Sequence, residues 1–579
     1  MKRSLCASFG ALLLTAGLSA SAQDWPQWGH DSQHTGTTSA IGQPAQHILA
    51  DVVYDPFTAQ EKADPLAGGD LLAHYQTPLV DGDDVYMEFK TGAYTTLDHW
   101  ETQIWNEKRL GWNHGHLTTV WTFQSDWKPV PYGSATNGPA FEPVFHAVLS
   151  GSFVYVPGAG GSIFKVAKSD GHLVARIMPI SPSGPALDRD TFTASPLTAD
   201  AAGNIYYTTL KLNHANPWDV DIVGSWLVKV SPAGVAHAAS ITSLTPGAPH
   251  GNDHCLGIFD TSQLPWPPSP NAVPPSVPCG TQRVGLNSAP AVAPDGTVYL
   301  VSVAHLWSRE SYLIAANSDL SPKWHASLRD RLHDGCNVLL PPNGTPNGCK
   351  VGAATGVDPA QNRPGAGRVI DDNTASPIVA PDGAIFYGAY TRFNYFQGHL
   401  MKFSSAGQFL AAYRFGWDDT PAIYAHDGTY SVITKDNQYG DSGSYCDDET
   451  FCPSDRTTYN PSFPEAYFIT RLNKDLQVES RWQNLNPLSC TRDASGNVTC
   501  VNDHPVGFEF CVNAPAVDRF GNVYNNSEDG NLYVVRPNGT LREHLFLDSA
   551  VGAAYTPLAI GGDGKIYTQN DGHLFVVGH

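Results

Sequence analysis

One pattern recurs eight times along the chain, and this repeat constrains the fold more than any other feature. Each copy has a small or polar residue, a proline, three apolar positions, an Asp/Gly turn and a strand-like run, as in TPLVDGDDVYM. The prolines of the eight copies are Pro78, Pro143, Pro196, Pro290, Pro377, Pro421, Pro515 and Pro557. The closest copies are 44 and 42 residues apart. Repetition at such a spacing is typical of propellers and solenoids.

A second unit of strand, short polar turn and strand follows most copies, as in IFKVAKSDGHLVARI after Pro143. The two units together give four strands, A to D, which is the content of a propeller blade. Only 15% of the residues are charged, and 54 Gly and 44 Pro favour short strands and tight turns over long helices. The sequence therefore predicts an all-β fold, a single eight-bladed β-propeller of four-stranded antiparallel blades over residues 23–579.

The eighth copy is incomplete, because the chain ends at His579 after only three strands. Residues 45–57, AQHILADVVYDPF, precede the first copy and alternate like a D strand without a partner. We expect this N-terminal strand to close the last blade, since closure removes exposed strand edges that would otherwise template aggregation.

The first 22 residues have the pattern of a secretory signal peptide. Lys2 and Arg3 precede an apolar run, and small residues end it at Ala22. No later segment is long and apolar enough to span a membrane. The mature chain would carry 32 basic and 55 acidic residues, which argues against nucleic acid or anionic lipid as a partner. We expect a secreted or periplasmic protein.

Long connections are expected on one face of the ring. The A–B and C–D turns are short, whereas the long segments all fall in B–C or D–A connections, and these share a face: 88–115, 242–285, 329–374, 437–465 and 484–511. Long loops gathered around one channel mouth are where binding groups are usually carried. All nine cysteines beyond Cys6 lie in or beside these segments.

Nearest-neighbour pairing of these cysteines is the simplest disulfide hypothesis for an exported protein. The pairs would be Cys255–Cys279, Cys336–Cys349, Cys446–Cys452 and Cys490–Cys500. Cys511 is then left over, and its pairing with Cys490 or Cys500 stays open.

Polar residues just before the A strands are the first candidate site. They should face the axis at the long-loop mouth, and they are Asn287, Asp371, Asp372, Asn373, Glu509 and Asn513. Such a ring of oxygens could hold a sugar, a quinone or Ca²⁺. The alternative is that each side chain caps its own turn or a neighbouring blade's backbone.

The chain resembles the eight-bladed, quinoprotein-like (PQQ-like) propellers, which include quinoprotein dehydrogenases and an outer-membrane-assembly lipoprotein. The resemblance rests on DWPQWGHDSQHTG (24–36), the eight Pro-containing units and units such as SIFKVAKSDGHLVARI (162–177). It covers nearly the whole mature chain. The family's Asp-x-x-Thr-Gly-x-x-x-Trp signature is mostly degraded here.

The resemblance implies PQQ and Ca²⁺ as candidate cofactors. In the family's dehydrogenases PQQ lies between a Trp and a vicinal disulfide, with Ca²⁺ held by Glu, Asn and Asp. Glu509, Asn287 and Asp371 could imitate those calcium ligands. The chain has no adjacent Cys pair and no Cys-x-x-Cys-His haem attachment sequence.

Histidines give a further hypothesis. NHGH supplies His114 and His116, and HGNDH supplies His250 and His254. We assign both stretches to insertions on the long-loop face, where His-x-His and a carboxylate could bind zinc or copper.

Three functions follow in order of preference. The first is an exported propeller that binds a small molecule, a saccharide or a protein partner at its loop-capped channel face, with no recognisable catalytic constellation. The second is a PQQ- and Ca²⁺-dependent oxidoreductase acting on alcohols or sugars. The third, by analogy of fold alone, is a polysaccharide lyase that uses Trp112, His114, His116 and Arg368.

Overall fold

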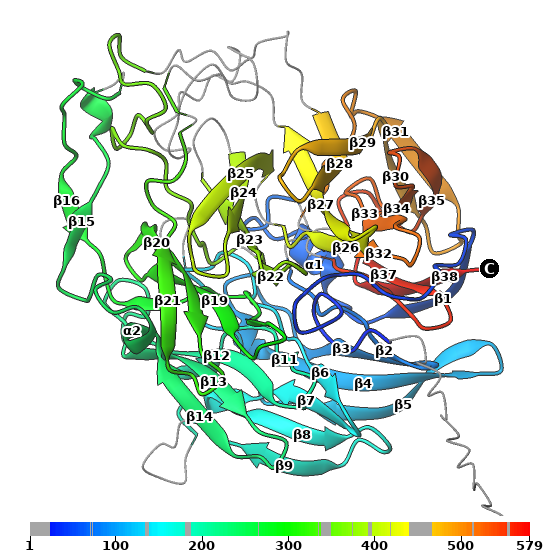
Figure 1. Ribbon diagram of the computed structural model, residues 1–579. Coiled ribbons are helices and arrows are strands. Elements are labelled where there is room, and N and C mark those ends of the chain that lie inside the picture. Colours follow the sequence, from blue (N-terminus) through cyan, green and yellow to red (C-terminus); the bar gives the residue numbers. More distant parts are fainter. Residues whose placement is uncertain are drawn as a thin grey trace, which may run out of the picture.

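The computed structural model shows a ring of eight antiparallel blades (Figure 1), so the predicted eight-bladed propeller is confirmed. It describes residues 24–69, 71, 73–133, 138–179, 187–263, 266–333, 335–336, 349–372, 374–391, 397–416, 419–438, 466–511, 514–552 and 556–579. The proposed signal peptide, residues 1–22, lies outside this part of the chain.

The first four blades follow the order of the repeats, with the innermost strand given first. Blade 1 contains β2 (Leu79–Asp81), β3 (Asp84–Gly92), β4 (Gln103–Asn113) and β5 (His116–Gln124). Blade 2 contains β6 (Val148–Ser150), β7 (Phe153–Pro157), β8 (Ile163–Ala167) and β9 (Leu173–Ile177). In blade 3, β10 (Thr191–Thr193) and β11 (Thr198–Ala199) share the inner position before β12 (Ile205–Lys211), β13 (Gly224–Val230) and β14 (Ala236–Ser240). In blade 4, β17 (Gln282–Val284) and β18 (Ala291–Val292) do the same before β19 (Val298–Ala304), β20 (Trp307–Ala316) and β21 (Pro322–Ser327).

The other four blades complete the ring. Blade 5 contains β22 (Ile378–Val379), β23 (Ile385–Tyr390), β24 (Gln397–Phe403) and β25 (Phe409–Gly416). Blade 6 contains β26 (Ala422–His426), β27 (Thr429–Gln438), β28 (Ala466–Asn473) and β29 (Val478–Gln483). Blade 7 contains β32 (Ala516–Val517), β33 (Val523–Asn526), β34 (Asn531–Val535) and β35 (Leu541–Phe546). Blade 8 contains β36 (Ala559–Ile560), β37 (Ile566–Asn570), β38 (His573–Gly578) and β1 (His47–Val53).

The last blade is closed by the two ends of the chain, as the sequence predicts. Strand β1 pairs antiparallel with β38, from His47 opposite Gly578 to Val53 opposite His573. The N-terminal strand therefore supplies the fourth strand that the eighth repeat lacks, and no blade depends on an unpaired third strand.

The hydrophobic core lies between the blades. Strand β19 is buried at every position, because the blades on both sides cover it. One cluster joins Val301 and Leu313 of blade 4 to Ile385 and Tyr387 of blade 5. Each blade thus needs its neighbours to bury its two faces.

Short elements lie in the connections between strands. They are α1 (Thr58–Lys62), α2 (Ile241–Leu244), the 3-10 turns η1 (Trp100–Thr102), η2 (Ala159–Gly161) and η3 (Thr261–Gln263), and the hairpins β15 (His254–Leu256) with β16 (Ser276–Pro278) and β30 (Leu488–Arg492) with β31 (Val498–Asn502). In the described part of the chain, no helix has the length and apolar character needed to cross a bilayer.

The long connections that the structure describes lie on the B–C and D–A side, with one correction. The predicted insertion 437–465 lies outside the described residues from residue 439 onward. The segment 88–115 is not an insertion, because β3 extends to Gly92 and β4 spans Gln103–Asn113. Only residues 93–102 form that B–C connection. Its C-terminal part, around His114, is the tight β4–β5 turn on the opposite face.

Three of the predicted disulfides are present, and all three are in the long insertions. They are Cys255–Cys279, Cys336–Cys349 and Cys490–Cys500. The fourth predicted pair, Cys446–Cys452, lies outside the described residues. Because Cys490 and Cys500 are bonded to each other, Cys511 pairs with neither of them.

Residues 24–43, here named the inner segment, run around the channel and contact every blade in chain order. The segment appears in Figure 1 as dark-blue chain near the centre of the ring. Its partners are the innermost strands or the turns that follow them: Val80, Leu149, Ala199, Val292, Val379, Ile423, Val517 and Gly564. Trp25 and Val80 exchange two backbone hydrogen bonds, of 3.0 and 2.9 Å, and the side chain of Gln27 bonds both the N–H and the C=O of Ala199.

A glycine in this segment offers a test of its importance. Gly36 has φ +63°, and a Cβ there would lie 2.9 Å from the Pro515 oxygen and 3.0 Å from the Ala422 Cβ. Gly36→Ala should lose about 1–2 kcal/mol for the left-handed backbone and about 1–3 kcal/mol more for overpacking. Urea unfolding measures the sum of these two losses. The control is Gly115→Ala, at φ +82° with no atom within 4 Å of the added Cβ. Equal losses in the two variants would contradict the role of the inner segment.

Candidate functional site

The predicted axial residues of blades 4 and 5 form a buried network. Asn287 accepts a hydrogen bond from the Val144 N–H (2.9 Å) and donates to the Asp371 carbonyl (3.2 Å). Its Nδ2 is also 3.3 Å from Nδ1 of His74, a ring kept neutral because burial lowers the pKa of His74 to about 3. The amide of Asn287 thus links blades 2, 4 and 5 across the channel.

The carboxylates beside Asn287 are also engaged by the protein. Arg283 binds both oxygens of Asp371, at 2.8 and 2.6 Å, and its Nε donates to His305 Nδ1. Asp372 accepts the Ala140 N–H at 2.7 Å. The structure therefore brings Asn287, Asp371 and Asp372 together. Their polar atoms, however, form hydrogen bonds and an ion pair with neighbouring blades.

The remaining axial predictions lie elsewhere or cannot be placed. Glu509 accepts a hydrogen bond of 3.2 Å from Asn437 of blade 6. Asn373 and Asn513 lie outside the described residues. The ligand role of Asn373 and Asn513 therefore stays a prediction.

The donor set does not fit a Ca²⁺ and PQQ site. The Asp371 carboxylate is already held by Arg283, and Oδ1 of Asn287 by Val144. The three disulfides of the described chain are separated by 24, 13 and 10 residues, so none is vicinal. Within the same residues, no three His, Cys, Asp or Glu side chains gather closely enough to hold a metal ion.

The four histidines proposed for a metal site lie on two different faces, which corrects their common assignment to the long-loop face. His114 and His116 flank the β4–β5 turn, whereas His250 and His254 lie in the insertion between blades 3 and 4. All four are exposed. The same placement separates Trp112, His114 and His116 from Arg368, which bridges to Tyr390 at the other end of its blade.

A buried charged cluster lies where the chain closes, and the sequence analysis missed it. Lys90 Nζ is 2.9 Å from Asp55 and also contacts Glu142, and Asp55 accepts a hydrogen bond from the Tyr75 hydroxyl (2.9 Å). The three charged side chains are at most 2% exposed. Asp55 follows β1, Lys90 is in β3 and Glu142 precedes β6, so the cluster joins the closing strand to blades 1 and 2. The signal was a Glu and a Lys inside the apolar run DVYMEFKTG of β3.

Two further carboxyl groups lie beside this cluster. Glu88 and Glu107 face each other on β3 and β4, and Gln76 bonds both, with its N–H to Glu88 and its Nε2 to Glu107, each at 3.2 Å. Burial raises the pKa of Glu107 to about 8 and also raises that of Glu142, where Lys90 opposes the shift. Glu107 therefore holds a proton at neutral pH.

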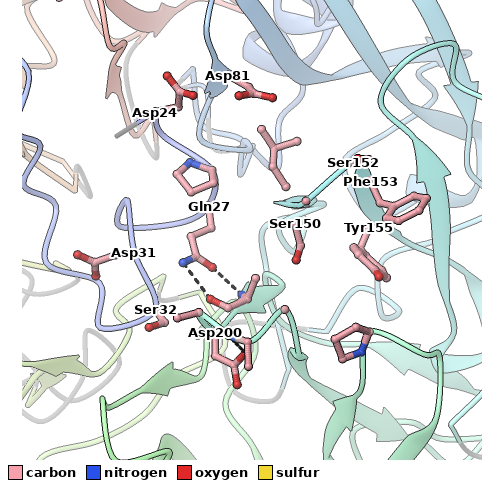
Figure 2. A pocket seen from close by; sticks show the side chains of 18 of the residues that line it. Asp24, Gln27, Asp31, Ser32, Asp81, Ser150, Ser152, Phe153, Tyr155 and Asp200 are labelled. Carbon is pink, nitrogen blue, oxygen red and sulfur yellow. Dashed lines mark hydrogen bonds between the residues drawn. The ribbon is translucent and has the colours of Figure 1, made fainter. Parts of the chain in front are cut away.

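A cavity of about 1010 Å³ lies on the A–B face, between the inner segment and blades 1 to 3. In Figure 2, Asp24, Gln27, Asp31 and Ser32 of the inner segment lie on one side, and Phe153 and Tyr155 lie on the other. The turns of blades 2 and 3 add Ser150, Ser152 and Asp200. The volume is that of a ligand site for a small molecule.

His30 is the unusual group in this cavity. Its side chain is only 3% exposed, its φ is +76°, and its ring packs edge-on against Trp25. Nδ1 is 3.5 Å from Asp31, and Nε2 has no hydrogen-bond partner. Burial alone would raise the pKa of Asp31, but His30 and Thr35 outweigh it and hold that pKa below its ordinary value. Buried polar atoms in native proteins are nearly always bonded, so Nε2 is a candidate contact for a bound molecule or water.

The charges lining the cavity favour neutral or cationic ligands. Four carboxylates, of Asp24, Asp31, Asp81 and Asp200, face two ammonium groups, of Lys165 and Lys168. Lys168 is paired with Asp81, and Lys165 lies 4.0 Å from the centre of the Phe153 ring. An anion would therefore meet a net negative wall. Residues 24–36 have no strand periodicity, and no local pattern marks them as the wall of a cavity.

Comparison with known proteins finds similar solved structures but no sequence relative. No family model and no curated protein matches the chain. Solved structures do match. A europium-containing methanol dehydrogenase is 11% identical, with 94% of this chain and 89% of that chain covered and a TM-score of 0.46. A quinohemoprotein alcohol dehydrogenase from Comamonas testosteroni is 10% identical, with 96% and 81% covered and a TM-score of 0.46.

A third solved structure matches more weakly. BamB from Moraxella catarrhalis also matches, at 10% identity and a TM-score of 0.30, with 88% of this chain and 86% of that chain covered. The propeller fold is shown by the strand pairing of this chain. Identities this low say nothing about its ligand.

The buried carboxyl groups predict a pH dependence of stability. The pKa of Glu107 is about 8 in the folded protein against an ordinary 4.5. Between these values the folded state holds a proton that the unfolded state has released, so stability falls as pH rises through 8. Glu107→Gln should flatten this fall and make the protein more stable than wild type at pH 8, measured by urea unfolding from pH 5 to 8. Glu101→Gln, at an exposed site, is the control. An unchanged slope in Glu107→Gln would show that Glu107 is ionised throughout.

Proposed function

We propose that this protein is an exported propeller that binds a small saccharide in the cavity beside the inner segment. The observation that carries the proposal is the cavity itself, about 1010 Å³ with a buried histidine in its wall whose Nε2 lacks a partner. The three disulfides support an oxidising compartment.

The lining has the chemistry that a neutral polyhydroxyl ligand needs. Phe153 and Tyr155 offer apolar ring surface, Ser32, Ser150 and Ser152 offer hydroxyls, and Asp24 offers a carboxylate acceptor. A few polar groups fix the orientation of a ligand, while aromatic surface supplies the area that it buries. The excess of carboxylates disfavours acidic sugars.

The proposed site lies on the face opposite the long insertions, whereas the sequence predicts a site at the loop-capped mouth of the channel. On the insertion side, the predicted axial groups bond to one another and to backbone, as Asn287 and Asp371 do. On the A–B side, the inner segment and the turns of blades 2 and 3 leave open volume between them.

A blocking variant tests the proposal. Ser152 lines the cavity in an exposed turn, so Ser152→Trp should fill it without disturbing the core. We expect glucose or maltose to raise the unfolding temperature of the wild type, since a ligand that binds only the folded state stabilises it. The shift should vanish in Ser152→Trp.

Ala406→Trp is the matched control, because Ala406 is an exposed turn residue on the same face of blade 5. It should keep the wild-type shift. Stabilisation by citrate or putrescine but by neither sugar would reject a saccharide, and sugar binding that survives in Ser152→Trp would reject the cavity.

A further inference from the structure

A smaller cavity, of about 360 Å³, lies on the B–C and D–A side of the ring, opposite the cavity beside the inner segment. We name it the aromatic pocket. The B–C connection of blade 1, the segment that follows β5 and strand β10 of blade 3 form its walls. Its lining includes three aromatic residues, Trp100, Tyr132 and Phe192, and three charged ones, Asp98, Glu101 and Lys128.

The connections that form this pocket are held in place by the rest of the chain. The Asp64 carboxylate accepts hydrogen bonds from the Leu97 N–H at 2.8 Å and from the Tyr94 hydroxyl at 2.9 Å. On the other side, the Trp218 indole donates to the Pro131 carbonyl at 2.9 Å. Both walls are therefore ordered before any ligand arrives, which lowers the entropy cost of binding.

The aromatic rings give the pocket surfaces that attract positive charge. The rings of Trp100 and Tyr132 contact each other, with their centroids 5.7 Å apart and their planes at 57°. Trp100 is buried, whereas Tyr132 and Phe192 are half-buried and keep part of their surface open. The face of an aromatic ring carries partial negative charge, so it binds an ammonium group placed over it.

The charged residues add an excess of negative charge. Two carboxylates, of Asp98 and Glu101, line the pocket with one ammonium group, that of Lys128. The chain itself already uses this ammonium group, because Nζ of Lys128 donates to the Gln103 carbonyl and lies 5.6 Å from the centre of the Trp105 ring.

Of the two carboxylates, one is shared and one is free. Glu101 is 2.8 Å from Nδ1 of His99. Asp98 is exposed and has no ion-pair partner in the described part of the chain. The mouth of the pocket therefore presents a carboxylate that a cationic ligand can pair with.

The electrostatic environment of Tyr132 has the same sign. Burial raises the pKa of its hydroxyl, and the charges of Asp372, Asp98 and Asp64 raise it further. All three of these charges are negative, so the potential at the ring favours a cation beside it.

We propose that the aromatic pocket binds a small organic cation that carries an ammonium group. Aromatic faces and a carboxylate in one pocket recognise such groups through cation–π contacts and charge, and quaternary ammonium groups are recognised especially well. The volume suits a ligand as small as choline or a short diamine. The site is independent of the proposed saccharide site, which lies on the opposite face.

The test is isothermal titration calorimetry of the full chain with two cations and their uncharged counterparts. Choline is paired with dimethylbutanol, in which a carbon atom replaces the charged nitrogen, and putrescine is paired with butanediol. We expect at least one cation to bind, and its counterpart to bind about tenfold more weakly or not at all. A preference for choline or for putrescine distinguishes a quaternary from a primary ammonium group. Absence of binding by both cations, or equal binding by the counterpart, would overturn the proposal.

Variants assign the binding to the aromatic pocket. Tyr132→Leu should weaken it about fivefold, the size of a cation–π contact, whereas Tyr132→Phe keeps the ring face and should bind nearly as the wild type does. Asp98→Asn should weaken binding about threefold, the size of a surface ion pair. The matched control is Asp427→Asn, in a turn of blade 6 where the side chain is 95% exposed, and it should change nothing.

Ser152→Trp separates this site from the larger cavity, whose lining also has an excess of carboxylates. This variant should bind the cation as tightly as the wild type does. Urea midpoints equal to that of the wild type establish that each variant is folded, and if Tyr132→Leu is less stable, Asp98→Asn decides. Binding that is lost in Ser152→Trp, or that is unchanged in both Tyr132→Leu and Asp98→Asn, would overturn the assignment.

Discussion

The free inner edges of the innermost strands are the constraint on which the rest of this propeller depends. Eight short strands point unpaired N–H and C=O groups toward the axis, and in most blades these strands are only two or three residues long. Unpaired edges are costly when buried. The inner segment removes this cost by passing each blade in turn, from Trp25 at blade 1 to Gln43 at blade 8. The inner segment thus pairs the inner edges of the blades, just as neighbouring blades bury the faces of each blade.

The same end of the chain then closes the ring. After the inner segment, β1 pairs with β38, and the next residues carry Asp55 to the buried Lys90. About thirty N-terminal residues therefore touch all eight blades. Contacts between the first and last strands are of the greatest sequence separation that the chain allows, and such contacts slow folding. The last blade is complete only when the first strand has met the final repeat.

The fold could be predicted from sequence because each repeat carries its own local signals. A proline, an apolar triplet, an Asp/Gly turn and an alternating strand specify a hairpin without reference to distant residues. The closing strand was also predictable, because 45–57 had no partner and the last blade lacked one. The site was not predictable in the same way. Whether Asn287 faces a ligand or Val144 depends on which blades meet across the channel, and no local pattern records this. His114 was misplaced because β3 and β4 extend beyond the usual length and turn an expected insertion into a hairpin.

Net charge describes this surface poorly. A chain with a formal charge of −21 still places two lysines beside four carboxylates in the lining of its larger cavity. One wall of this cavity is the inner segment itself. A ligand in that cavity contacts the chain that seals the ring, so its binding energy adds directly to the stability of the closed propeller.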